Sequence, residues 1–160
     1  MKKVLFMCIN MNTGGTEKAL LTMLNEMDTG KYDITLLMLE KFGGFLNEIP
    51  GYVNVKYIDG FRDIKTFINE PPQLLAKELI KSKKYFKGIN TLLYYSISKI
   101  TNDISYYYRY VLRNINKLDE EYDLAVAYAG PMDLIRHLLK RIIKSLIRYL
   151  WFQKKERISL

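Results

Sequence analysis

Cysteine is nearly absent from this sequence, and so are long uncharged apolar segments. The one cysteine, Cys8, lies inside an apolar run. Neither a disulfide framework nor a cysteine-rich metal site can form from it, so a reducing compartment is expected. No stretch reaches the roughly 18 uncharged apolar residues of a membrane-spanning helix. The N-terminal apolar run is only about six residues long and lacks a small-residue cleavage site, so it is not typical of a secretory signal. We expect a cytoplasmic protein.

Acidic residues are scarce at the C-terminal end. From Arg136 to Leu160 the chain has eight Lys and Arg residues and one acid, Glu156. The net charge of +8 is concentrated there, because residues 1–135 hold 17 Lys and Arg against 16 Asp and Glu. A nearly neutral body with a basic C-terminal segment does not favour nucleic-acid binding by the whole surface. The 160 residues, 49% of them apolar, have room for one domain with its own core.

Apolar runs predict four strands. Three of them are near-continuous and typical of strands buried on both faces of a parallel sheet, and the third in chain order alternates more; the four are residues 4–9, 32–39, 53–58 and 122–130. Between the first two predicted strands, apolar residues recur at helical spacing, so a helix is expected there. A helical turn is also expected near residues 45–49. The predicted fold class is α/β: a single Rossmann-like domain with a mostly parallel sheet, long helices and a basic amphipathic C-terminal helix.

The segment from Ile89 to Leu118 predicts one long helix, because its apolar residues recur three or four positions apart along its whole length. Tyr106, Tyr107, Tyr108 and Tyr110 lie within it. We interpret these tyrosines as core and rim packing of an amphipathic helix, and a platform that stacks bases or sugars is the alternative.

Two adjacent glycines follow the first predicted strand, at the turn where doubly wound folds often bind ligands. Glycine lets a ligand or another backbone come close there, and the amides of the following helix would face an anion. Neither the G-x-G-x-x-G pattern nor the phosphate-binding P-loop pattern occurs. A tight turn without a ligand therefore remains an alternative. The candidate residues are Asn12, Thr13, Gly14, Gly15, Thr16, Glu17 and Lys18.

Three segments together resemble a known family: KKVLFMCINMNTGGTEKALLTMLNEMD, YDITLLML and YDLAVAYAG. They are similar to the N-terminal, acceptor-side domain of bacterial GT-B glycosyltransferases of the retaining, glycogen-phosphorylase-like kind. The resemblance covers roughly residues 2–60 and 119–132, and in the family a similar glycine loop lies near the donor diphosphate and the acceptor. It implies that Gly14 and Gly15 are close-approach glycines and that Glu17 and Lys18 open a helix beside the cleft.

The resemblance also implies a function. A full-length relative transfers a sugar from a nucleotide-sugar donor to a glycan or lipid-linked acceptor in surface polysaccharide synthesis, without a metal or other cofactor. Such an enzyme has a second, donor-binding domain, so this chain is expected to be truncated and inactive alone unless a second chain supplies that domain. The alternative function is a non-catalytic module that binds an acceptor or partner and docks on the membrane. No His, Cys and acid cluster predicts a metal site, and no catalytic residue is assigned.

The expected domains are an incomplete glycosyltransferase N-terminal domain over residues 1–133 and a basic amphipathic helical tail over residues 134–160. Apolar pairs recur every four residues in this tail with basic residues between them. Three interpretations remain open: a helix on the inner face of an anionic membrane, a truncated or frame-shifted gene end, or a helix that packs on the sheet with its basic face in water. His137 is expected to be solvated. The residues expected to face the membrane are Arg136, Lys140, Arg141, Lys144, Arg148 and Trp151.

Overall fold

The computed structural model describes residues 1–130, 132–143 and 146–151. The chain divides into two compact units. Unit 1 comprises residues 1–58 and the chain from Lys117 onward, and unit 2 comprises residues 59–116. Unit 2 is inserted between the third and fourth strands of unit 1, so the connection between these strands is a helical unit of its own.

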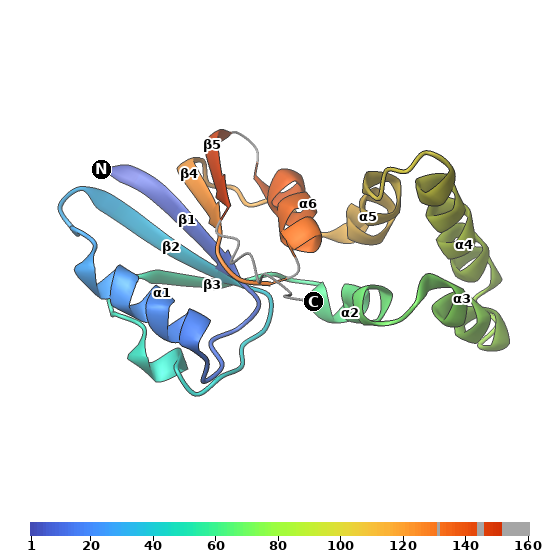
Figure 1. Ribbon diagram of the computed structural model, residues 1–160, viewed down its shortest axis with the longest axis horizontal. Coiled ribbons are helices and arrows are strands. Elements are labelled where there is room, and N and C mark those ends of the chain that lie inside the picture. The colour runs from blue at the N-terminus through green and yellow to red at the C-terminus, as the bar shows by residue number, and fades with distance from the viewer. Residues whose placement is uncertain (131, 144–145, 152–160) are drawn as a thin grey trace, which may run out of the picture. The chain divides into compact units, whose positions relative to one another are not determined.

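Unit 1 is built on a five-stranded parallel sheet with the order β3-β2-β1-β4-β5 (Figure 1). The strands are β1 (Lys2–Cys8), β2 (Tyr32–Met38), β3 (Asn54–Tyr57), β4 (Tyr122–Ala127) and β5 (Leu146–Trp151). Near-continuous apolar runs form the central strands, because both faces of a parallel sheet are covered. The α/β class, the parallel sheet and the first four strands are confirmed.

Helix α1 (Gly15–Glu26) covers one face of the sheet. Its buried residues Leu20, Leu21 and Leu24 form a core with alternate strand residues, which include Val4, Phe6, Cys8, Ile34, Leu36 and Met38. The connections β1-α1-β2 and β4-α6-β5 lead in opposite directions along the sheet. Since such crossovers are right-handed, the helices α1 and α6 (Met132–Ile142) cover opposite faces, which gives the doubly wound arrangement.

The C-terminal helix is shorter than expected. The amphipathic helix α6 is present, but it ends at Ile142, and the backbone of residues 146–151 forms β5 in parallel pairing with β4. The prediction of a helix through residues 146–151 is therefore wrong. A strand at this position satisfies the backbone groups along the edge of β4, which a helix would leave unpaired. The expected domain boundary after Asp133 lies inside α6.

Unit 2 contains α2 (Phe61–Asn69), α3 (Pro72–Lys81), α4 (Tyr85–Ile100), α5 (Ser105–Val111) and the short 3-10 helix η2 (Leu112–Asn114). The single helix expected from Ile89 to Leu118 is therefore wrong. Asn102 adopts a left-handed conformation with φ of 50°, which ends the helical path. Asp103 then accepts a hydrogen bond from the backbone N–H of Ser105 at 2.9 Å, which forms a turn directly before α5.

The loop after β2 contains a 3-10 turn, η1 (Leu46–Glu48), which confirms the helical turn expected there. Among the described residues, no helix is both long enough and apolar enough to cross a membrane.

Candidate functional site

The loop between β1 and α1 is held by its own polar groups. The backbone N–H of Asn12 donates to Asn10 Oδ1 at 3.3 Å, and that of Thr13 donates to Asn12 Oδ1 at 2.9 Å. Gly14 donates to the Asn12 carbonyl at 3.0 Å and precedes α1 as its N-cap, without a side chain to cap the helix. The sequence-predicted residues 12–18 therefore form one continuous turn and first helical turn at the carboxyl end of β1.

A second glycine pair, Gly43 and Gly44 in the loop after β2, holds this turn in place. Gly43 has φ of +128°, and a Cβ there would overlap the Met11 carbonyl and lie 2.5 Å from the Asn12 nitrogen. Met11 exchanges backbone hydrogen bonds of 3.0 Å with Phe42 and Phe45 on either side of Gly43. The close backbone approach thus occurs at Gly43. The sequence signal was a glycine pair after the second strand as well as after the first.

Gly14 and Gly15 have different surroundings. A Cβ at Gly14 would collide with the Glu17 carboxylate, which folds back over the N-cap. A Cβ at Gly15 would have no heavy atom within 4 Å, and its φ is not in the left-handed region. Neither packing nor backbone conformation therefore requires glycine at position 15. Glycine there leaves the exposed start of α1 open to an incoming group.

The Glu17 carboxylate lies where two loops of the sheet meet. Burial first, and then the charge of Glu17, raise the pKa of Cys8 at the end of β1 to about 12. The same two causes raise the pKa of Tyr128, which directly follows β4. Glu17 is half-buried, so its charge acts on the carboxyl ends of both strands. Cys8 stays a protonated thiol at neutral pH, which makes it a poor nucleophile.

Strands β1 and β4 flank the point where the direction of chain connection reverses. Gly130, with φ of +134°, brings the loop after β4 against the loop after β1: a Cβ there would lie 3.0 Å from Ile9 Cγ1. Doubly wound folds bind ligands in the crevice at this topological switch point. We define the switch-point site as Asn12, Thr13, Gly14, Gly15, Thr16, Glu17, Lys18 and Tyr128.

The switch-point site has a definite chemistry. Thr13, Thr16 and Lys18 are exposed and offer hydroxyl and ammonium groups, and the first amides of α1 lie at the positive end of the helix dipole. The Glu17 carboxylate opposes a second anion at these amides and accepts hydrogen bonds from hydroxyl groups. The described residues contain no group of three or more His, Cys, Asp and Glu side chains placed to hold a metal ion.

The residues expected to face a membrane lie on α6 and beyond. Leu134, Ile135, Leu138, Leu139 and Ile142 are buried, whereas Arg136, Lys140 and Arg141 are exposed. Helix α6 thus has a basic face in water and its apolar face inside the protein. Lys144 and the side chains of Arg148 and Trp151 lie outside the described residues. His137 is half-buried on α6, and its Nδ1 lies 2.7 Å from the Asp133 carbonyl oxygen.

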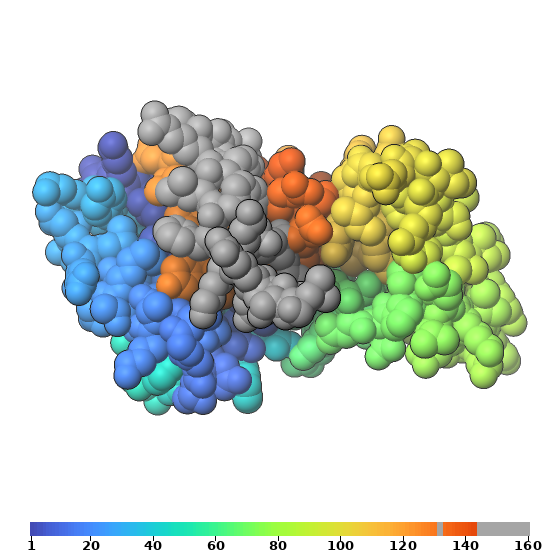
Figure 2. Space-filling model, in the orientation of Figure 1, coloured from blue at the N-terminus to red at the C-terminus, as the bar shows by residue number. Residues whose placement is uncertain are grey.

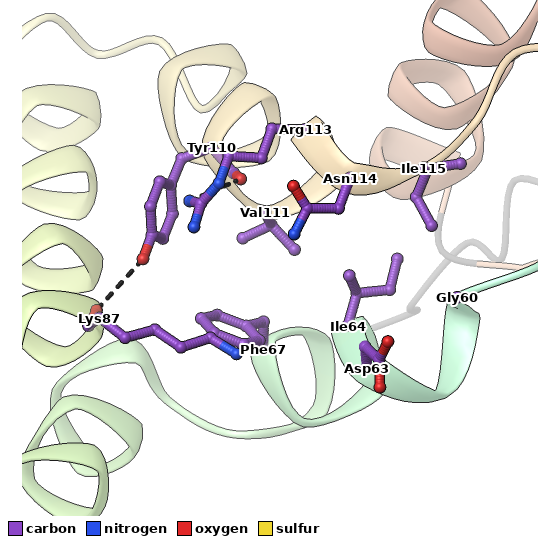
Figure 3. A pocket seen from close by; sticks show the side chains of 10 residues that line it. All are labelled: Gly60, Asp63, Ile64, Phe67, Lys87, Tyr110, Val111, Arg113, Asn114 and Ile115. Atoms are coloured by element: carbon purple, nitrogen blue, oxygen red, sulfur yellow. Dashed lines mark hydrogen bonds between the residues drawn. The ribbon is translucent and has the colours of Figure 1, made fainter. Parts of the chain in front are cut away.

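The tyrosine cluster of unit 2 serves mainly as packing. Tyr107 and Tyr110 are buried, and their hydroxyls donate to the carbonyls of Phe67 and Lys87 at 3.0 and 3.2 Å. Figure 3 shows Tyr110 beside a cavity of about 60 Å³. This cavity is far below the roughly 300 Å³ of a small-molecule site, so it fits water rather than a sugar or nucleotide.

Comparison with known proteins identifies no relative: no protein family, curated protein or solved structure matches this chain. The glycosyltransferase resemblance therefore remains a proposal, and its support comes from the fold and the switch-point site.

Proposed function

We propose that this chain is the acceptor-side half of a glycosyltransferase, which takes a sugar from a nucleotide-sugar donor and passes it to a glycan or lipid-linked acceptor. The strand order β3-β2-β1-β4-β5 supports this proposal because it creates a switch point between β1 and β4. The glycine loop, which is one part of the family resemblance, follows β1 at that point.

One observation carries the proposal: Gly15 opens onto free space at the start of α1, although nothing in the fold requires glycine there. Glycine inside a helix costs roughly 0.5–1 kcal/mol relative to alanine, and part of that cost applies at Gly15, the first residue of α1. A ligand that comes close to the backbone at this position would explain why glycine is present there.

Glu17 indicates which of the two substrates the loop binds. Its carboxylate disfavours a phosphate directly against the first amides of α1, and it accepts hydrogen bonds from sugar hydroxyls. We therefore assign the acceptor sugar, rather than the donor diphosphate, to the switch-point site. In this scheme Glu17 orients the acceptor hydroxyls. A facing domain, in this polypeptide or a second chain, binds the nucleotide and stabilises the diphosphate leaving group electrostatically.

The experiment is calorimetric titration of the chain with octyl glycosides of glucose, galactose and N-acetylglucosamine below their micelle concentrations. Gly15→Leu should abolish binding, because its side chain fills the open space. Gly51→Leu is the matched control, since a Cβ at Gly51 also meets no heavy atom within 4 Å. Equal affinity of both variants for every glycoside, or no binding of any glycoside by the unmodified chain, would refute the proposal.

A non-catalytic binding module is the second candidate, and the exposed apolar side chains of Phe86, Ile89, Leu93 and Ile100 on α4 favour it. A measurement of sugar transfer distinguishes the two functions. A catalytic half should support sugar transfer to a glycoside once a donor-binding domain is added, whereas a binding module should not.

A further inference from the structure

Helix α4 carries large apolar side chains on its outer face. Phe86 and Ile100 are 88% and 85% exposed, and Ile89 and Leu93 are each more than half exposed. These positions lie three, four or seven residues apart, so they share one face of the helix. We call Phe86, Ile89, Leu93 and Ile100 the α4 stripe. At 1.5 Å per residue it is roughly 20 Å long. Part of α4 forms the surface seen in Figure 2, where it runs from yellow-green to yellow.

The opposite face of α4 is buried although its residues are small or polar. Gly88, Thr91 and Ser98 lie inside, and a Cβ at Gly88 would be 3.0 Å from the Ala76 carbonyl of α3. The Thr91 and Ser98 hydroxyls donate to carbonyls of their own helix at 2.7 Å, so they are buried without unpaired polar atoms. Helices α3 and α4 thus pack closely through small residues, which leaves the large apolar residues of α4 outside.

The chain around the α4 stripe is strongly basic. Residues 81–100 contain Lys81, Lys83, Lys84, Lys87 and Lys99, all exposed, and no acidic residue. Eight of the twelve exposed large apolar side chains among the described residues belong to unit 2, although it is much the smaller unit. Exposed apolar side chains that concentrate in this way mark an interaction surface.

A shallow pocket adjoins the α4 stripe. Asn90 and Tyr94 follow Phe86 at four-residue intervals, so they form the neighbouring row on α4. Together with Tyr106, Tyr110, Arg109 and Arg113 they line a depression of about 650 Å³. This lining holds two guanidinium groups and no carboxylate, which suits a phosphate group.

We propose that the α4 stripe docks unit 2 on an anionic membrane surface, with Arg109 and Arg113 at the level of the lipid phosphates. Apolar residues on one helix face with flanking lysines are the pattern of helices that lie in the membrane interface. A second copy of the chain is a poorer partner, because two such stripes would bring together ten lysines without an acid between them. This inference does not depend on the proposed sugar transfer.

The test is co-sedimentation of the full chain with vesicles. Binding should occur with phosphatidylglycerol vesicles, weaken in 0.5 M salt and be minimal with phosphatidylcholine. Phe86→Gln should weaken the binding about tenfold, because it removes one inserted aromatic side chain. Phe42→Gln is its control, since Phe42 is exposed in unit 1 and should leave vesicle binding unchanged. Exposed positions keep both variants folded, which circular dichroism checks.

Reversal of the charge of two lysines near the α4 stripe gives a second test of vesicle binding. Lys84→Glu with Lys87→Glu should abolish binding, whereas the same charge change at Lys2 and Arg62, exposed on β1 and α2, should have a much smaller effect. Three results would overturn the proposal: no binding of the unmodified chain, equal binding by Phe86→Gln and Phe42→Gln, or binding that only Lys154→Glu with Lys155→Glu removes. A Phe86-dependent dimer without vesicle binding would identify a second copy as the partner instead.

Discussion

Replacement of Gly43 by alanine tests how the two loops at the switch-point site are held together. Gly43 has φ of +128°, and a side chain there would overlap the Met11 carbonyl. The unfavourable backbone conformation costs about 1–3 kcal/mol in an L-residue other than glycine. Displacement of Met11 also breaks its hydrogen bonds to Phe42 and Phe45, worth about 1 kcal/mol each. We therefore expect the free energy of unfolding of unit 1 to fall by about 3–5 kcal/mol.

That loss is a large fraction of the 5–15 kcal/mol that is usual for a domain. Urea titration followed by circular dichroism measures it. With a slope near 2 kcal/mol per molar urea, the midpoint should fall by roughly 2 M. Gly51→Ala is the control, since a Cβ at Gly51 meets no atom within 4 Å. Equal midpoints for the two variants would refute the claim that Gly43 allows the two loops to touch.

Three further predictions concern single residues. Gly15→Ala should raise the midpoint of thermal unfolding slightly, because alanine favours a helix interior by roughly 0.5–1 kcal/mol and Gly15 is the first residue of α1, where the gain is smaller. The pKa of Cys8 is about 12 in the folded chain and 9.0 in the unfolded chain, so the folded chain keeps the thiol proton to a higher pH. The free energy of unfolding should therefore fall as pH rises above 9, and Cys8→Ala should reduce that fall. The pKa of Glu120 is lowered by its hydrogen bonds with Lys56 and then Tyr122, so its contribution is present above 4.5 and lost as pH falls further. In acid titrations by circular dichroism, Glu120→Gln should show a smaller loss of stability.

The sheet was predictable from sequence because its strands are buried. Residues 4–9 are apolar without interruption and residues 32–39 nearly so, with Asp33 and Thr35 as the polar positions, and a short, near-continuous apolar run is typical of a strand covered on both faces. β5 was missed because its apolar pairs continue the four-residue spacing of α6. The spacing of apolar residues along the chain does not reveal that β4 has an open edge. Pairing with that edge determines the structure of residues 146–151.

Helix α4 shows a different limit of sequence analysis. The spacing of Ile89, Leu93 and Ile100 correctly predicted that they share one face of a helix, but spacing alone does not decide whether that face is buried. The structure exposes this face and buries Gly88, Thr91 and Ser98. Hydrophobic periodicity identifies a common face, whereas close packing against α3 decides which face is inside.

The switch-point site was partly predictable. The turn and the first residues of α1 lie together at the carboxyl end of β1, as the glycine pair and the preceding strand indicated. The contributions of Tyr128 and Gly43 come from loops about 115 and 30 residues away in the chain, and only the parallel pairing of β1 with β2 and β4 brings them to this place.

Backbone amide chemical shifts, mapped during titration with an octyl glycoside, test for an acceptor site at the switch point. The largest changes should fall on Gly15 to Lys18 and on Tyr128 to Gly130, and Gly15→Leu should remove them. Changes confined to unit 2, or none at saturating glycoside, would contradict an acceptor site at the switch point.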